Sequence, residues 1–195
     1  MSVLLLAGSP SERSRSAALL DEVGARLTRR GAQVDRVLIR DLSPQALLLA
    51  DLGHPSIRHA VAQVARAEVL VIATPVYKAA YSGVLKVFLD LLGQSALQGK
   101  TVLPLATGGS ANHMLALDYA LRPVLQSLGA RHILSGIYAT EAQIAHTEPG
   151  GYQLNHEISA RLDEAVNTLI TEALRPVRSA GRFASVPFSQ VRCSV

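Results

Sequence analysis

The sequence predicts a doubly wound α/β fold, with five parallel strands in the order 2-1-3-4-5 and helices on both faces of the sheet. Short apolar runs, typical of strands that are buried on both faces, recur along the chain. Stretches with the apolar periodicity of amphipathic helices separate these runs. Because the two patterns alternate from one strand to the next, they favour a parallel sheet over an antiparallel one.

Each predicted strand is short and apolar. The strands are expected at Val3–Ala7, Gln33–Ile39, Val69–Ala73, Thr101–Ala106 and His132–Leu134, and the last strand either ends there or continues to Tyr138. The first run follows no basic segment and turns polar after Ala7. We therefore interpret it as a strand and not as a signal peptide.

Helical periodicity appears after each strand. Helices are expected at Ser14–Arg30, Ser56–Ala67, Tyr81–Leu92, His113–Leu128 and Leu154–Leu174. Gly31, Gly93 and Gly129 lie where three of these helices should end. The longer connection Leu42–Pro55 has room for one short helix.

The composition indicates a globular protein. Of 195 residues, 49% are apolar and 17% are charged, and no apolar run approaches the roughly 18 residues of a membrane-spanning helix. We predict a single domain over residues 1–174 and a basic, extended tail over 175–195. The tail holds four of the 19 basic residues, so the other 15 balance the 15 acidic ones and offer no surface for nucleic acid. The single cysteine excludes an internal disulfide, and we expect a cytoplasmic protein.

The segment 8–16, here called the serine loop, has the composition of a phosphate site. It leads into a predicted helix, and the N-terminus of a helix attracts anions. Hydroxyls of Ser9, Ser14 and Ser16 and a guanidinium from Arg13 or Arg15 would complete the site. A turn with Ser14 as N-cap is the alternative, but it explains only one of these serines. The loop has one glycine, so it is not the GxGxxG pattern of dinucleotide-binding folds.

The segment 74–83, here called the tyrosine loop, combines a stiff proline, two tyrosines and small hydroxyl residues. It includes Thr74, Pro75, Val76, Tyr77, Lys78, Tyr81, Ser82 and Gly83. Backbone N–H groups of Val76–Lys78 can meet the polar edge of a flat aromatic ligand, and Tyr77 can cover its ring. Ser82 is expected to open the next helix and to join the site. Alternatively, the two tyrosines are packing or interface residues, and we assign Tyr81 to an oligomer interface.

The segment 107–113, here called the glycine loop, follows the fourth strand. It contains Thr107, Gly108, Gly109, Ser110 and His113. Paired glycines allow a ligand ring to approach the backbone closely, although a flexible turn before a helix is the alternative. His113 alone is more often a first-turn helix residue than a catalyst, but we include it among the binding candidates.

In a parallel sheet these three loops meet at one edge. A phosphorylated planar heterocycle fits their combined chemistry, and FMN fits best, with an adenine nucleotide as the competitor. The remaining histidines lack the spacing of metal ligands, and no GxSxG nucleophile motif occurs. We therefore predict no metal site and no catalytic side chain.

Three stretches resemble a known family. They are LAGSPSERSRS, ATPVYKAAYSGVLKVFLDLL and ALQGKTVLPLATGGSANHMLALDYALRPVLQSLGA with the strand that follows it. Over about residues 3–145 the chain resembles the NADPH-dependent FMN reductases of the flavodoxin-like superfamily. Within that family it is most similar to the reductase component of two-component alkanesulfonate monooxygenase systems.

The resemblance implies the ligands and the role of the site. The FMN phosphate would sit on Ser9, Ser14, Arg15 and Ser16, the isoalloxazine beside Pro75, Val76, Tyr77 and Lys78, and its other edge along Thr107, Gly108, Gly109 and Ser110. A hydride would pass from NADPH, or from NADH as the alternative, to the flavin N5. FMN would be a substrate or weakly held, and a reduced-flavin-dependent monooxygenase would use it to release sulfite from alkanesulfonates. The serine loop departs from its relatives at Glu12 and Arg13, so both arginines stay candidates for the phosphate.

The fourth predicted helix contains a built-in defect. Pro123 has no N–H, so the carbonyl of Tyr119 loses its helical partner and a kink or a π-bulge is expected. The resembling reductases carry a π-helix at this tyrosine, at a subunit interface. The resemblance therefore implies a homodimer or homotetramer with Tyr119 at a contact between dimers, whereas a kinked core helix is the alternative.

Other functions stay open from the sequence. One is a reductase of quinones, azo compounds or metal oxyanions that retains its FMN. Another is a non-enzymatic electron carrier of the flavodoxin type, although such carriers are strongly acidic and this body is neutral. The last is a module that binds AMP or ATP.

Overall fold

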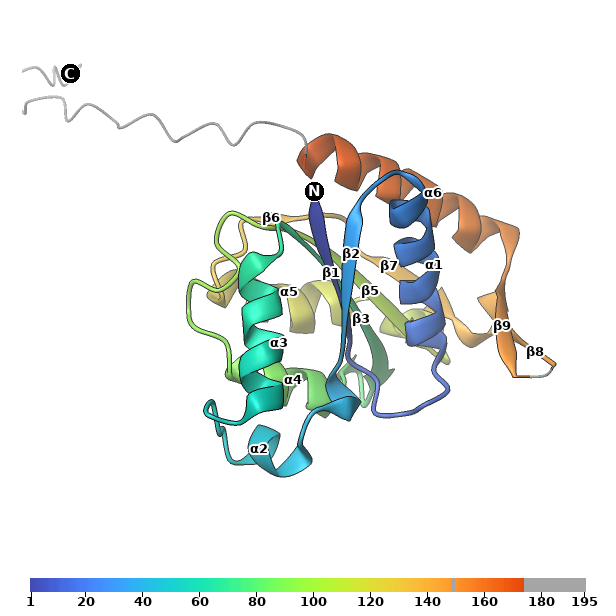
Figure 1. Ribbon diagram of the computed structural model, residues 1–195. Coiled ribbons are helices and arrows are strands. Elements are labelled where there is room, and N and C mark those ends of the chain that lie inside the picture. The colour runs from blue at the N-terminus through green and yellow to red at the C-terminus, as the bar shows by residue number, and fades with distance from the viewer. Residues whose placement is uncertain (149, 174–195) are drawn as a thin grey trace, which may run out of the picture.

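The computed structural model describes residues 1–148 and 150–173, and a parallel sheet forms its centre (Figure 1). The strands of this sheet are β1 (Ser2–Ala7), β2 (Gln33–Leu38), β3 (Val69–Tyr77), β5 (Thr101–Gly108), β6 (His132–Ile133) and β7 (Ile137–Thr140). Their order is β2-β1-β3-β5-β6, and β7 continues alongside β5. Since β5 is the fourth predicted strand and β6 with β7 the fifth, the predicted flavodoxin-like order is confirmed.

The fifth predicted strand is interrupted between β6 and β7. Ile133 pairs with Val102, and Ile137 pairs with Leu105. Between these two pairs, the fifth predicted strand has three residues (134–136) and β5 has two (103–104). The fifth strand therefore contains one extra residue, which forms a bulge. One of the two β5 residues is Pro104, which has no N–H to give to the ladder. Because the bulge separates β6 from β7, the predicted alternative of one continuous strand from His132 to Tyr138 was wrong.

Helices cover both faces of the sheet (Figure 1). One layer holds α1 (Arg15–Arg29) and α6 (His156–Ala173), and the other holds α3 (Pro55–Arg66), α4 (Gly83–Asp90) and α5 (Arg122–Ser127). A 3₁₀ turn at Ile39–Asp41 and the short helix α2 (Pro44–Leu48) precede α3. The short helix expected in the long connection is therefore present.

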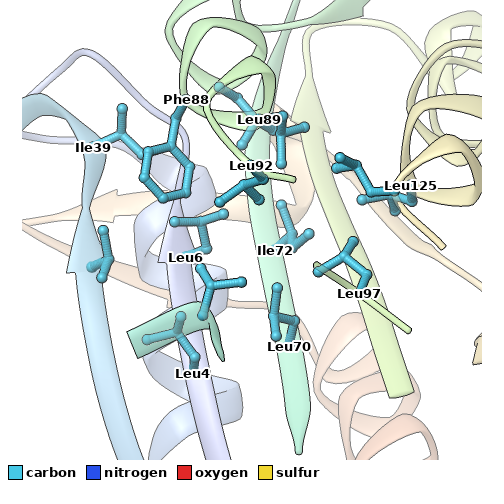
Figure 2. Close-up of a cluster of buried hydrophobic side chains, with 14 of the residues drawn as sticks. Leu4, Leu6, Ile39, Leu70, Ile72, Phe88, Leu89, Leu92, Leu97 and Leu125 are labelled. Carbon is cyan, nitrogen blue, oxygen red and sulfur yellow. The ribbon is translucent and has the colours of Figure 1, made fainter. Parts of the chain in front are cut away.

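Alternate residues of each central strand face opposite layers. Leu4, Leu6, Leu70 and Ile72 belong to the cluster under α3, α4 and α5, as Figure 2 shows for one part of it. Their neighbours Val3, Leu5, Val69 and Val71 belong to the cluster under α1 and α6. This two-residue alternation explains why the strands are apolar on both faces.

The tyrosine loop begins with a tight hairpin that the sequence analysis did not predict. β3 runs on to Tyr77, turns, and returns as β4 (Ala80–Tyr81), with Tyr77 opposite Ala80. Lys78 and Ala79 at the turn have φ values of 50° and 62°. Helix α4 therefore begins at Gly83, two residues later than predicted, with Ser82 as its N-cap. The turn has no Asn-Gly or Gly-Gly pair, which is the usual signal of a two-residue hairpin.

Replacing Ala79 by glycine is expected to stabilise the protein. An L-residue at positive φ is strained, and glycine removes the clash of its Cβ with the backbone. Part of this gain is offset because glycine is more flexible in the unfolded chain, so we expect about 0.5–1 kcal/mol. Urea unfolding followed by circular dichroism measures the difference. A lower urea midpoint for Ala79→Gly than for wild type would contradict the positive φ of Ala79 in this turn.

The fourth predicted helix is divided into unlike segments. A 3₁₀ turn at Ala111–His113 is followed by a π-helical turn at Leu117–Leu121 and then by α5. The π-helical turn lies directly before Pro123, so the predicted defect is confirmed as a π-bulge. Tyr119, within that turn, is 79% exposed.

A second hairpin follows β7. A 3₁₀ turn at Glu141–Gln143 leads into β8 (Ile144–Thr147), which pairs antiparallel with β9 (Gly151–Leu154). This hairpin lies apart from the central sheet, beside the end of α1 where that helix begins (Figure 1). The sequence analysis predicted no element here.

Two predictions concern parts that lie outside the described residues. These are the end of the domain at residue 174 and the basic tail at 175–195. Within residues 1–148 and 150–173, none of the helices combines the length and the apolarity that crossing a membrane requires.

Candidate functional site

The three loops meet at the edge where the central strands end. The N–H of Gly8 donates to the carbonyl of Ala73 (2.8 Å), which joins the serine loop to the start of the tyrosine loop. Pro75 lies opposite Thr107 in the ladder of β3 and β5, so the tyrosine and glycine loops leave the sheet side by side. The predicted convergence of the loops is thereby confirmed.

A cavity of about 290 Å³ lies between these loops and the β8–β9 hairpin. Predicted site residues from all three loops line it, namely Ser9, Arg13, Ser14, Arg15, Pro75, Val76, Tyr77, Thr107, Gly108 and Gly109. The lining residues that the sequence analysis missed are Ser11, Glu141, His146 and Tyr152. The last three belong to the segment after β7, where no motif or strand signal marked them.

Five predicted residues do not line this cavity: Ser16, Lys78, Ser82, Ser110 and His113. Ser16 is buried, and its hydroxyl lies 2.8 Å from that of Ser14. Lys78 is exposed at the hairpin turn, and His113 is exposed in a 3₁₀ turn. Direct contact between these residues and a ligand stays a prediction.

Ser82 connects the loops from below the cavity. Its N–H donates to Thr74 Oγ1 (2.9 Å), and its hydroxyl donates to the carbonyl of Gly8. The same hydroxyl oxygen accepts from the N–H of Leu85 (3.3 Å), which caps α4. Because Ser82 is 1% exposed and all its polar groups are engaged, its contacts fix the relative position of the serine and tyrosine loops.

The serine loop presents free donors at the start of α1. Ser14 is the N-cap, with its hydroxyl accepting from Ala17 N–H (3.4 Å). The N–H groups of Arg15 and Ser16 have no acceptor among the described residues. Unpaired N–H groups at the positive end of a helix favour an anionic ligand. The end of the cavity beside α1 therefore has the chemistry of a phosphate site.

The glycine loop is held from beneath by Tyr138. The Tyr138 hydroxyl donates to the carbonyl of Ser110 (2.6 Å). Burial raises the pKa of the Tyr138 phenol above its ordinary value of 10.0, so the donor proton is retained in the neutral range. A Cβ at Gly108 would clash with this hydroxyl and lie 3.4 Å from Val76 Cβ. Gly108 therefore allows the backbone, the tyrosine and the tyrosine loop to come close together.

Replacing Tyr138 by phenylalanine should loosen the glycine loop without unfolding the protein. The change removes one hydrogen bond, which we expect to cost about 1 kcal/mol of stability. The affinity for the ligand of the cavity should fall several-fold, because Ser110 and Gly108 lose their fixed position. Isothermal titration measures the affinity, and unchanged binding would show that the Tyr138 hydroxyl does not position this loop.

Two aromatic rings of the β8–β9 hairpin face the cavity. His146 on β8 and Tyr152 on β9 are cross-strand partners, and their ring centroids lie 4.6 Å apart with the planes tilted by 38°. Both rings line the cavity. The site thus combines an anion-binding end with aromatic and glycine-lined walls, as a phosphorylated planar ligand requires.

Comparisons with known proteins agree with this chemistry. A family model described as NADPH-dependent FMN reductase matches residues 1–144. A protein named FMN reductase (NADPH) from Escherichia coli (strain K12) is 45% identical over 170 residues, which cover 86% of this chain and 87% of that relative. A protein of the same name from Pseudomonas putida is 45% identical over 180 residues, or 90% of each chain. The crystal structure of the apo form of an NADH:FMN oxidoreductase (EMOB) superposes with a TM-score of 0.79 at 39% identity, covering 88% of this chain and 89% of that one.

Proposed function

Since this chain belongs to the NADPH-dependent FMN reductase family, we propose that the cavity at the edge of the sheet is where it binds FMN for reduction. The chain is an oxidoreductase that reduces FMN with NAD(P)H. The observation that supports the location is the convergence of the serine, tyrosine and glycine loops on one cavity. The alternative function, a module that binds AMP or ATP, is not supported, because the chain belongs to a family of FMN reductases.

The residues of the cavity fit FMN. The free N–H groups of Arg15 and Ser16 and the hydroxyls of Ser9 and Ser14 suit a phosphate. Gly108 lines the cavity, and because it has no Cβ, the Tyr138 hydroxyl and Val76 can pack close to its backbone. These features lie on separate loops of one cavity, so a ligand with a phosphate at one end and a planar ring at the other can contact both.

When bound, FMN supplies the hydride-accepting ring, and the protein contributes binding and orientation. The serine loop holds the phosphate end in place. Pro75, Val76 and the glycine loop support the ring, while Tyr77, which is 48% exposed, lies at the open rim. One side of the cavity stays accessible to a nicotinamide. No side chain is required to act as an acid or a nucleophile.

The destination of the reduced flavin is a partner monooxygenase. The three stretches that resemble the reductases of alkanesulfonate monooxygenase systems support this part of the proposal. The reduced FMN leaves the cytoplasmic reductase, and the monooxygenase uses it with oxygen to release sulfite from an alkanesulfonate. In this role FMN is a weakly held substrate.

Two assays test the proposal. NADPH oxidation with FMN titrated should show saturable dependence on FMN, and gel filtration should leave the purified protein largely free of flavin. A reconstituted mixture with an alkanesulfonate monooxygenase should release sulfite only when the reductase is present. Protein that keeps its FMN and reduces quinones in a ping-pong pattern would instead support the quinone-reductase function.

Four large exposed side chains, from the β3–β4 hairpin and from the segment that leads to α5, support assembly. They are Tyr77 (48% exposed), Met114 (56%), Leu115 (53%) and Tyr119 (79%). Interfaces between subunits are often formed where several large apolar side chains are exposed together. The protein is accordingly a homotetramer in this proposal, with Tyr81 and Tyr119 at subunit contacts and the Tyr119 hydroxyl bonded across one of them.

Tyr119→Ala should separate the tetramer into dimers. The change removes a large side chain that would be buried at the contact. A tyrosine that anchors an interface contributes about 2 kcal/mol, which corresponds to about 30-fold in the dissociation constant. Sedimentation velocity gives the assembly, and NADPH oxidation gives the activity. If the variant keeps both the wild-type assembly and the wild-type rate of FMN reduction, Tyr119 is not at a functional interface.

A further inference from the structure

A second cavity, of about 470 Å³, lies at the β6 edge of the central sheet. One of its walls is the segment 133–137, which contains the bulge between β6 and β7. The other wall is formed by the middle turns of α6. Among the described residues, none lines both this cavity and the cavity between the three loops. Binding of FMN between the loops therefore leaves the second cavity unused.

Two opposite charges, Arg161 and Glu164, line the α6 wall of this cavity. Arg161 Nη1 donates to the carbonyl of Tyr138 (3.2 Å), and its other two nitrogens have no acceptor among the described residues. The Glu164 carboxylate forms no hydrogen bond and no ion pair within residues 1–148 and 150–173. Side chains three residues apart on a helix can pair with each other. Here the bond to Tyr138 directs the guanidinium toward β7, so both charges stay unpaired.

The other charged side chains of α6 have partners. Glu157 accepts from Gln143 Nε2 (3.1 Å), and Asp163 accepts from Arg26 Nε (2.9 Å). Near the end of the helix, Glu172 lies 3.4 Å from the ring of His132. The one unpaired cation and the one unpaired anion on the described part of α6 thus share a cavity. Together they favour a ligand that itself carries one charge of each sign.

The opposite wall combines free backbone groups with apolar side chains. The N–H groups of Ser135 and Gly136, in the bulge, have no acceptor among the described residues. Such groups can bind the anionic end of a ligand. Ile133, Leu134 and Ala165 also line the cavity and offer apolar contact area. The ligand should therefore have an apolar part beside its two charges.

We propose that this cavity binds an α-amino acid with an apolar side chain. Arg161 and the N–H groups of the bulge bind its carboxylate, Glu164 accepts from its ammonium group, and its side chain lies against Ile133 and Leu134. The two charges of an α-amino acid sit on one carbon, which suits protein side chains that are one helical turn apart. The volume of the cavity falls within the range of small-molecule sites, about 300–1,000 Å³. The proposal does not depend on the FMN site, because it concerns other residues.

The test uses the full chain and three probes that share a phenyl ring. They are L-phenylalanine, N-acetyl-L-phenylalanine, in which a neutral amide replaces the ammonium group, and 2-phenylethylamine, which lacks the carboxylate. Titration followed by ¹H–¹⁵N NMR gives a dissociation constant for each probe. The same spectra locate each probe by the shifts of the amides at 133–137 and 161–168.

Three variants are compared with wild type: Arg161→Gln, Glu164→Gln and the control Arg29→Gln. The control removes one exposed charge of α1 that does not line the cavity. NADPH oxidation with FMN is measured on each sample, and Glu164→Gln and Arg29→Gln should keep the wild-type rate. If Arg161→Gln fails to fold, the comparison of the three probes on wild type still decides.

Wild-type protein should bind L-phenylalanine with a dissociation constant of about 1 mM or lower. Each of the other probes should bind at least about tenfold more weakly, because it lacks one charge-assisted contact. Arg161→Gln should abolish the advantage of L-phenylalanine over 2-phenylethylamine. Glu164→Gln should abolish its advantage over N-acetyl-L-phenylalanine, and Arg29→Gln should match wild type.

Three results overturn the proposal. One is equal affinity of wild type for the three probes. Another is a set of shifts confined to residues outside 133–137 and 161–168. The last is an affinity for L-phenylalanine that neither Arg161→Gln nor Glu164→Gln changes. Failure of the proposed function would appear separately, as wild-type protein that binds L-phenylalanine but does not oxidise NADPH with FMN.

Discussion

Replacing Gly108 by alanine is expected to weaken FMN binding by about 100-fold while the protein stays folded. The new Cβ would clash with the Tyr138 hydroxyl, which is fixed by its hydrogen bond to the Ser110 carbonyl (2.6 Å). Either the tyrosine or the glycine loop must move, and a displacement of about 1 Å at such a site can cost two orders of magnitude. Fluorescence titration with FMN measures the loss.

The neighbouring glycine supplies the control. A Cβ at Gly109 would meet nothing closer than Glu141 Oε1 at 3.9 Å, so Gly109→Ala should unfold at the wild-type temperature. The double variant Gly108→Ala, Tyr138→Phe gives a sharper test. Without the hydroxyl, the nearest ring atom would be Cζ at 3.4 Å, which is ordinary contact, so part of the lost affinity should return. No recovery would show that the clash is not the cause.

Phe88→Ala is expected to lower the free energy of unfolding by about 3–5 kcal/mol. Phe88 lies on α4 and is 0% exposed, with its ring between Ile39 and Leu6 (Figure 2). Removing the ring leaves a cavity between α4 and the sheet. For a chain of this size the unfolding temperature should fall by roughly 6–20 °C.

The conservative variant separates packing from hydrophobicity. Phe88→Leu keeps most of the apolar volume, so it should cost less than about half as much as Phe88→Ala. Both variants should bind FMN when folded, because Phe88 does not line the cavity. A cost below about 1 kcal/mol for Phe88→Ala would mean that α4 is not packed on β1 as described.

The central sheet and its order followed from the sequence because buried parallel strands are apolar on both faces. The meeting of the three loops could also be predicted, since the order of the parallel strands brings the loops that follow them to one edge of the sheet. Pro123 also marked the π-bulge correctly, because the missing N–H is a local property of the residue.

Other features depend on contacts that no local pattern reveals. The β3–β4 hairpin turns at Lys78 and Ala79, which carry none of the usual glycine or asparagine signal. The bulge before β7 arises from pairing with β5, far away in the sequence. Glu141, His146 and Tyr152 reach the cavity only because the hairpin folds back beside α1. The hydrogen bonds by which Ser82 joins the serine and tyrosine loops were likewise not indicated by the sequence, and its contact with a ligand stays a prediction.

The most direct test of the account is the kcat/KM of NADPH oxidation with FMN compared with riboflavin. The phosphate is the group that the serine loop is built to hold, and charge-assisted contacts of this kind are worth about tenfold or more in affinity. We predict clear saturation with FMN and a kcat/KM for riboflavin at least about tenfold lower. Equal values for the two flavins, or no FMN-dependent oxidation by folded protein, would contradict the assignment of this cavity.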